Sequence, residues 1–321
     1  MRRLVWTFAA AALLAAPALA QPWPQRPIQL ILPASAGGNS DILGRILAEN
    51  LRASLGQPVV MEYRAGAAGR IAAEAASRAD PDGYRFFMTS SGPHGVVPAM
   101  YRQLSYDPVR SFVPVARLAT SPNVLYVKGD SRFRTLADLI AFAKANPGKL
   151  NVGSAGFGTT MHLSAVLLGL KSGITFTNVP YKGGSEALTG VLAGDVDAAF
   201  ESLPVVKPQI EAGALRALAL TARERAALLP DVPTMAEAGL PAVESLSWYG
   251  VLAPVGTPQP IVARLSETLK AALSQPAIVQ QLRSQIGAEP AYLPPGEFEA
   301  FYTRDIAAWT KVVEEAGIPR E

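Results

Sequence analysis

The chain alternates short apolar runs with longer segments whose apolar residues recur every three or four positions. Short runs rich in Val, Ile and Phe predict buried strands, and the longer periodic segments predict amphipathic helices. We expect strands at 28–33, 58–63, 85–90, 112–118, 123–128, 150–154, 175–180, 196–200, 215–221 and 247–253. We expect helices at 41–55, 69–78, 135–145, 160–170, 185–193, 204–212, 259–274, 276–285, 296–303 and 305–316. This order predicts an α/β fold with mixed, mainly parallel sheets flanked by helices.

Two long connections divide this pattern into two lobes. Segment 111–130 is a long extended passage, and segment 221–250 is rich in proline. We interpret them as two crossovers between a first lobe, 21–120 plus 250–321, and a second lobe, 121–249. Two lobes joined in this way enclose a cleft, and clefts between domains are preferred sites for small molecules.

The first twenty residues have the pattern of a secretory signal peptide. Arg2 and Arg3 precede an apolar stretch, which ends in Ala18-Leu19-Ala20. This pattern predicts cleavage after Ala20 and export of the mature chain. The alternative is a membrane anchor, but the apolar stretch is shorter than the roughly 20 residues that a spanning helix needs.

Composition excludes several classes of function. Removing residues 1–20 takes away two arginines and lowers the formal charge from +3 to +1, and the remaining basic residues are scattered rather than gathered in a patch. Nucleic acid is therefore not an expected partner. The chain has no cysteine, and His94 and His162 lie far apart in the sequence. We therefore expect no metal site and no cofactor.

The small residues of "PASAGGNSD" (33–41), between a strand and a helix, suggest an anion site. Gly37 and Gly38 lack a Cβ, so a ligand can approach the backbone closely. Asn39 or Ser40 is a natural N-cap, and the first turn of a helix offers unpaired N–H groups with a positive macrodipole. The carboxylate of Asp41 satisfies the same dipole, so a plain strand-to-helix turn is the alternative.

A second segment, "GSAGFGTTMH" (153–162), repeats this arrangement. Gly156 and Gly158 free the turn, and Ser154, Thr159 and Thr160 add hydroxyl groups. If the two segments belong to opposite lobes, two helix N-termini face each other across one cleft. A small acid suits such a site, particularly one with carboxylates at both ends.

Two further segments carry weaker signals. "VPYKGGSEAL" (179–188) again places Gly-Gly before a helix, and Ser185 either caps that helix or contacts ligand. Ser90 and Ser91 end a predicted strand, where they either bind ligand or satisfy a turn.

Catalytic patterns are incomplete. Gly183–Ala187 approaches a nucleophile elbow but ends in Ala, and the Gly156–Met161 segment lacks the third Gly of a dinucleotide fingerprint. We therefore expect a binding protein rather than an enzyme. An exported hydrolase that uses Ser185 or Ser154 is the alternative.

Taken in order, several segments resemble the Bug-type solute receptors of tripartite tricarboxylate transporters. They are "PASAGGNSDILGRILAENL", "GQPVVMEYRAGAAG", "PDGYRF", "LSYDPVRSFVPVARLA", "FAKANPGKLNVGSAGFGTTMHL", "VPYKGGSEALTGVLAGDVDAAF", "LPDVPTMAEAGLP" and "SWYGVLAPVGTP". The resemblance runs from about residue 24 to about residue 318. It implies a monomeric, periplasmic protein with the two-lobed type II binding-protein fold. Such a protein closes on a small organic acid and delivers it to membrane permease subunits; a periplasmic sensor is an alternative use of the same site.

The resemblance also implies a set of ligand contacts. The first anion-holding loop maps to Ala34, Ser35, Ala36, Gly37, Gly38, Asn39, Ser40 and Asp41. Its counterpart maps to Ser154, Ala155, Gly156, Phe157, Gly158, Thr159 and Thr160, with His162 beside it. With Ser90, Ser91 and Tyr181, these form the expected site. Glu201 stands at an acidic position of the family, where it repels a second carboxylate or accepts a hydrogen bond. Arg70 departs from the family pattern and is either solvated or directed at the ligand.

Overall fold

The computed structural model of the chain describes residues 23–320. The predicted signal peptide and its cleavage after Ala20 lie outside the described residues. Within 23–320, no helix is both long enough and apolar enough to span a bilayer.

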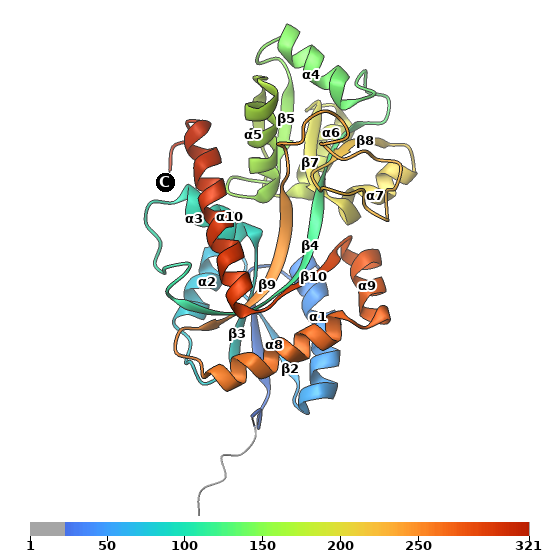
Figure 1. The fold of residues 1–321 in the computed structure, drawn as a ribbon. Helices are drawn as coiled ribbons and strands as arrows, with labels where there is room; N and C mark the ends of the chain where they lie inside the picture. The colour runs from blue at the N-terminus through green and yellow to red at the C-terminus, as the bar shows by residue number, and fades with distance from the viewer. Residues whose placement is uncertain (1–22, 321) are drawn as a thin grey trace, which may run out of the picture.

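Two lobes joined by the long strands β4 and β9 make up the fold (Figure 1). The strands are β1 (Ile28–Leu32), β2 (Val59–Tyr63), β3 (Arg85–Ser90), β4 (Phe112–Lys128), β5 (Asn151–Ser154), β6 (Thr177–Pro180), β7 (Ala198–Ser202), β8 (Leu215–Leu220), β9 (Leu246–Pro254) and β10 (Glu289–Leu293). Their order is β2-β1-β3-β9-β4-β7-β5-β6, with β8 and β10 also paired to β4. β1 pairs in parallel with β2 and β3, and β5 does so with β6 and β7, as the βαβ pattern predicts.

Helices cover the faces of both sheets. They are α1 (Asn39–Leu55), η1 (Ala67–Gly69), α2 (Arg70–Ser77), η2 (Gly92–Val96), α3 (Val97–Met100), α4 (Leu136–Ala145), α5 (Thr160–Ser172), α6 (Gly184–Ala193), α7 (Leu203–Glu211), α8 (Gln259–Leu273), α9 (Pro276–Ile286) and α10 (Pro295–Glu315). The leucine stripe of α1, from Leu43 to Leu55, is buried against the first sheet, as its four-residue spacing predicts.

The prediction of two strands at 112–118 and 123–128 is wrong, because β4 is one 17-residue strand. Short polar residues around Thr120 and Ser121 interrupt its apolar run. The strand nevertheless continues, because Phe112–Pro122 pairs with β9 and Asn123–Val127 pairs with β7. One strand therefore belongs to the sheets of both lobes.

The predicted helices 296–303 and 305–316 are likewise one helix, α10. Phe298, Tyr302 and Trp309 are buried on one side of it, so the apolar face continues past the predicted break. α10 runs along α3 and reaches α5 (Figure 1). Its residues Trp309 and Val313 join a core cluster with Leu163 of α5, so the end of the chain packs on the second lobe. The lobe boundaries near residues 120 and 250 remain a proposal.

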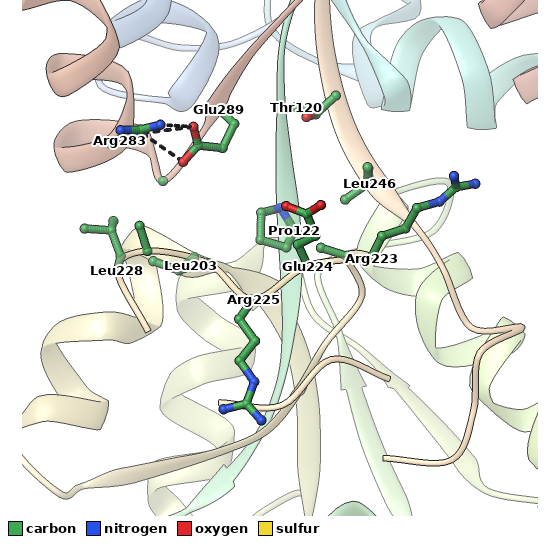
Figure 2. A pocket seen from close by; sticks show the side chains of 14 residues that line it. Thr120, Pro122, Leu203, Arg223, Glu224, Arg225, Leu228, Leu246, Arg283 and Glu289 are labelled. Atoms are coloured by element: carbon green, nitrogen blue, oxygen red, sulfur yellow. Dashed lines mark hydrogen bonds and ion pairs between the residues drawn. The ribbon is translucent and has the colours of Figure 1, made fainter. Parts of the chain in front are cut away.

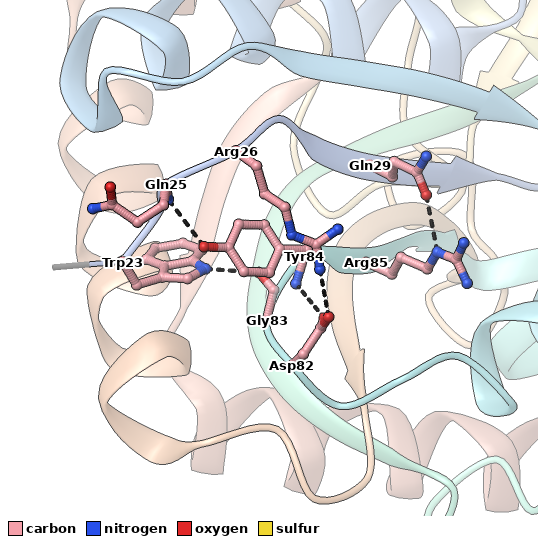
Figure 3. A network of polar contacts seen from close by, with 8 residues as sticks. All are labelled: Trp23, Gln25, Arg26, Gln29, Asp82, Gly83, Tyr84 and Arg85. Carbon is pink, nitrogen blue, oxygen red and sulfur yellow. Dashed lines mark hydrogen bonds and ion pairs between the residues drawn. The ribbon is translucent and has the colours of Figure 1, made fainter. Parts of the chain in front are cut away.

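Polar contacts hold the start of the described chain to the turn before β3 (Figure 3). Trp23 donates its indole N–H to the Gly83 carbonyl at 2.9 Å, and the guanidinium of Arg26 lies 2.6 Å from the carboxylate of Asp82. Tyr84 accepts a hydrogen bond from the backbone N–H of Gln25. These contacts place the first residues at the end of the molecule remote from the second lobe.

Candidate ligand-binding site

The loops after β1, β3 and β5 open into one cavity of about 490 Å³. Its lining comes from both predicted lobes: Ala34, Gly37, Gly38, Asn39, Ser40, Ala68, Ser90, Ser91, Gly92, Pro93, Gly158, Thr159, Thr160, Met161, Gly184, Ser185, Glu201, Ser202, Val205, Ser247 and Tyr249. The N-terminal residues of α1, α5, α6 and η2 are all present in this lining. Several helix starts therefore point at one space.

The loop before α1 is held by the aspartate that ends the Gly-rich segment. Asp41 accepts the backbone N–H of Gly37 at 2.8 Å through Oδ2. Its Oδ1 accepts hydrogen bonds from Nε of Arg45 at 2.9 Å and from the hydroxyl of Tyr63 at 2.7 Å. Burial alone raises the pKa of Asp41, but these hydrogen bonds hold the pKa below its ordinary value. Asp41 is buried outside the cavity lining, so it fixes the loop and leaves the cavity to a ligand.

The prediction of Asn39 or Ser40 as N-cap of α1 is wrong. The N-cap is Gly38, which has no side chain to bond the first turn. Because the first N–H groups of a helix have no partner within it, those of Asn39 and Ser40 are available at the cavity wall. The side-chain amide of Asn39 donates to the hydroxyl of Tyr249 at 3.2 Å, which ties this helix start to β9.

The loop before α5 is held by an uncharged cap. Thr159 is the N-cap, and its hydroxyl accepts the backbone N–H of His162 at 3.2 Å and donates to the Gly156 carbonyl at 2.9 Å. Gly158 has a φ of 78°, in the left-handed region that favours glycine. The hydroxyl oxygen of Thr160 lies 3.1 Å from that of Ser91. Since Ser91 follows β3, this contact joins the two sides of the cavity.

Charge at the cavity is unusual for an anion site. Among the described residues that line it, none is Lys or Arg, and Glu201 is the charged one. An anion here must therefore be held by backbone N–H groups and hydroxyls. Helix N-termini supply both hydrogen-bond donors and a positive partial charge.

Nine residues of the expected site lie outside the lining: Ser35, Ala36, Asp41, Ser154, Ala155, Gly156, Phe157, His162 and Tyr181. His162 is buried, its ring packs near Phe157, and burial lowers its pKa. Tyr181 packs against Gly190 of α6, where any larger residue would collide with its hydroxyl. Arg70 stacks on Tyr101 with its guanidinium carbon 4.1 Å from the ring centre, rather than facing the cavity.

Ten lining residues lie outside the expected set: Ala68, Gly92, Pro93, Met161, Gly184, Ser185, Ser202, Val205, Ser247 and Tyr249. The third Gly-rich segment, 179–188, was a sequence signal that could have identified Gly184 and Ser185. Ser247 and Tyr249 lie on β9, and no local pattern in "SWYGVLA" distinguishes a cavity-facing position from a core position. Only the crossing of the strands places them here.

A second cavity, of about 560 Å³, lies beside the joining strands between the α9–β10 turn and the loop 222–228 (Figure 2). It contains three arginines, but each is paired with a carboxylate. Arg283 binds Glu289, Arg223 binds Glu244 and Arg225 binds Glu237, each with Nε 2.9 Å from an oxygen. These cations are already neutralised, so the cavity with the helix starts is the better anion site.

Two lobes, a cavity between them and helix N-termini in its wall define a two-lobed solute-binding protein of the type II periplasmic class. Residues 43–318 match the family described as "Tripartite tricarboxylate transporter family receptor". The chain belongs to this family, as its resemblance to the Bug-type receptors predicts.

Relatives of known sequence or structure agree with this assignment. Protein BugT of Bordetella pertussis is 37% identical over 315 residues, which cover 98% of this chain and 96% of BugT. Rpa4515 of R. palustris, solved with adipate, has a TM-score of 0.84 and 38% identity, covering 92% of this chain and 99% of that one. The periplasmic binding protein BugD has a TM-score of 0.81 and 32% identity, covering 93% of this chain and 100% of that one. MatC of Rhodopseudomonas palustris, solved with malate, has a TM-score of 0.78 and 32% identity, covering 90% of this chain and 99% of that one.

Proposed function

We propose that this protein is a periplasmic receptor that captures a small carboxylate in the cavity between its lobes and delivers it to a tripartite tricarboxylate-type permease. The observation that carries the proposal is the convergence of helix N-termini on a cavity without a cation. Membership of the family supports the transport role, and the adipate and malate held by Rpa4515 and MatC support a carboxylate ligand.

Binding follows from the chemistry of the two loops. One carboxylate accepts hydrogen bonds from the N–H groups at the starts of α1 and α5, with the hydroxyls of Ser91 and Thr160 beside them. Because these donors come from both lobes, a bound carboxylate bridges the lobes. Binding and closure are therefore coupled, as in hinge closure around a ligand.

Export completes the proposal. The signal peptide, 1–20, is removed after Ala20, and the mature protein acts as a monomer in the periplasm. The expected ligand contacts in the two Gly-rich loops form part of the same proposal.

The rival reading as a hydrolase has little support in the geometry. Ser154 is buried outside the cavity lining, and its hydroxyl has no hydrogen-bond partner among the described residues. Ser185 lines the cavity, but the lining contains no histidine that could activate it. The sensor role uses the same ligand chemistry and differs only in the partner.

Isothermal titration calorimetry with ligand-free protein tests the proposed function. A panel of mono- and dicarboxylates of two to eight carbons should include at least one ligand that binds with micromolar affinity or better. Matched methyl esters and amides, which lack the carboxylates, should bind at least about tenfold more weakly, because they lose charge-assisted hydrogen bonds. The absence of heat across the panel, with equal thermal stability in its presence, would contradict a carboxylate receptor.

A further inference from the structure

Glu201 occupies a singular position in the cavity. It is the penultimate residue of β7, is only 5% exposed and lines the cavity. Its Oε1 accepts the backbone N–H of Ser202 at 2.6 Å. Its Oε2 lies against Gly184, the first residue of α6, so closely that a Cβ at Gly184 would be 1.3 Å from that oxygen. The carboxylate therefore fills the space beside the start of α6, and only glycine leaves room for it.

The start of α6 consequently differs from those of α1 and α5. At α1 the nearest carboxylate, Asp41, is buried outside the lining, and the cap of α5 is the uncharged Thr159. At α6 the helix start also favours an anion, and the carboxylate of Glu201 occupies that place. Burial raises the pKa of Glu201 above its ordinary value, whereas the hydrogen bond from Ser202 lowers it. The α6 dipole and a hydrogen-bond donor placed beside the carboxylate favour its charged form.

A ligand in this cavity thus meets two different ends. The α1 and α5 side offers N–H groups and hydroxyls, which are donors that suit a carboxylate. The Glu201 side presents an acceptor with no cation in the lining to neutralise it. Placing a second carboxylate beside it juxtaposes like charges away from water, which is strongly unfavourable.

We propose that Glu201 determines specificity: the cavity takes a carboxylate at the α1 and α5 side and a hydrogen-bond donor, such as a hydroxyl, amide or ammonium group, beside Glu201, and it discriminates against linear dicarboxylates that reach it. The inference rests on the proposed function and names the ligand class within it.

Calorimetry with matched ligands tests this inference. Succinate and adipate are each compared with the monoamide and the ω-amino acid of the same chain length. At one of the two lengths, the wild-type protein should bind the monoamide or the amino acid at least about tenfold more tightly than the diacid. Glu201→Gln has the same shape without the charge, so it should bind that diacid at least about tenfold more tightly than wild type and lose the preference for the ammonium group.

Glu186→Gln is the matched control, since Glu186 lies in the first turn of α6 but is exposed and outside the lining. Glu186→Gln should leave the affinity of the diacid relative to the monoamide and the amino acid unchanged at both chain lengths. Equal or tighter binding of the diacid by wild type, with less than a twofold change in Glu201→Gln, overturns the inference and leaves the receptor function intact. If Glu201→Gln does not fold, the affinity of the wild-type protein for the monoamide or the amino acid relative to the diacid decides between the two outcomes. Absence of binding by all six compounds and by the wider carboxylate panel overturns the proposed function, and the inference with it.

Discussion

The two Gly-rich loops at the cavity, 33–41 and 153–160, each hold a helix start at the cavity wall, but different side chains fix their conformations. Both follow a parallel strand, both contain a glycine in the left-handed region, and both direct a helix start at the cavity. The first is held by a buried carboxylate, Asp41, which binds a loop N–H, an arginine and a tyrosine. The second is held by the hydroxyl of Thr159.

The difference between the two loops shows where a charged side chain lies relative to the cavity. Asp41 is buried outside the cavity lining, where Arg45 and Tyr63 bind its carboxylate. Thr159 lines the cavity and is neutral. Neither loop places a charged side chain in the lining at the helix starts where we propose that a ligand carboxylate binds, whereas Glu201 lines the cavity near the start of α6.

The largest expected effect comes from placing an anion at each helix start. Ser40→Asp and Thr160→Asp each put a carboxylate into the lining, where it competes for the N–H groups and repels the ligand. Two charges about 4 Å apart near a protein surface repel by about 4 kcal/mol. Each variant should therefore bind a carboxylate at least about a hundredfold more weakly. Calorimetry measures this effect.

Ser40→Asn and Thr160→Asn are the uncharged controls and should retain binding within about tenfold. Acidic residues favour the first turn of a helix, so the Asp variants should remain folded. Wild-type affinity in either Asp variant would show that its helix start does not hold the anion, and the two loops would then not be equivalent.

A smaller effect separates the loops by their response to pH. Asp41→Asn removes hydrogen bonds to a charged group and should lower the free energy of unfolding by about 2 kcal/mol at pH 7. Because the folded state lowers the pKa of Asp41, its contribution is present above the ordinary carboxylate pKa and is lost as pH falls through the lower folded value. Urea unfolding at pH 7 and pH 3 should therefore show a smaller difference between variant and wild type in acid.

Asp82→Asn is a suitable control for this measurement. Its partner Arg26 is exposed and Asp82 is itself 42% exposed, so the pair should contribute less than about 1 kcal/mol. An equal loss of stability in Asp41→Asn at both pH values would argue against an ionised Asp41 in the loop.

The smallest effect concerns the neutral cap. Thr159→Ala leaves the His162 N–H without its acceptor and should lower the free energy of unfolding by about 1 kcal/mol. Thr159→Ser retains the hydroxyl and should therefore retain most of the stability that Thr159→Ala loses. Because the cap is uncharged, the loss should be equal at pH 7 and pH 5 in urea unfolding. A loss of stability in Thr159→Ala that varies with pH would contradict the contrast between a charged anchor in the first loop and an uncharged cap in the second.

Much of this architecture was predictable from local patterns. Alternating strands and helices follow from hydrophobic period, and the three Gly-rich helix starts follow from small residues placed after strands. The joined elements β4 and α10 were not predictable, because the polar residues at 120–121 and 304–305 resemble breaks. Pairing with partner strands continues β4, and contacts on both lobes continue α10.

The sequence by itself determined the βα units, the family and the loops that expose backbone N–H groups, because these depend on spacing and on residue size. Tertiary structure alone decided which side of each loop faces the cavity. It placed Asp41 outside the cavity lining, bound to Arg45 and Tyr63, brought Tyr249 into the lining on a crossing strand, and set Glu201 against Gly184. Direction of this kind depends on contacts between residues far apart in the chain, which spacing along the sequence does not encode.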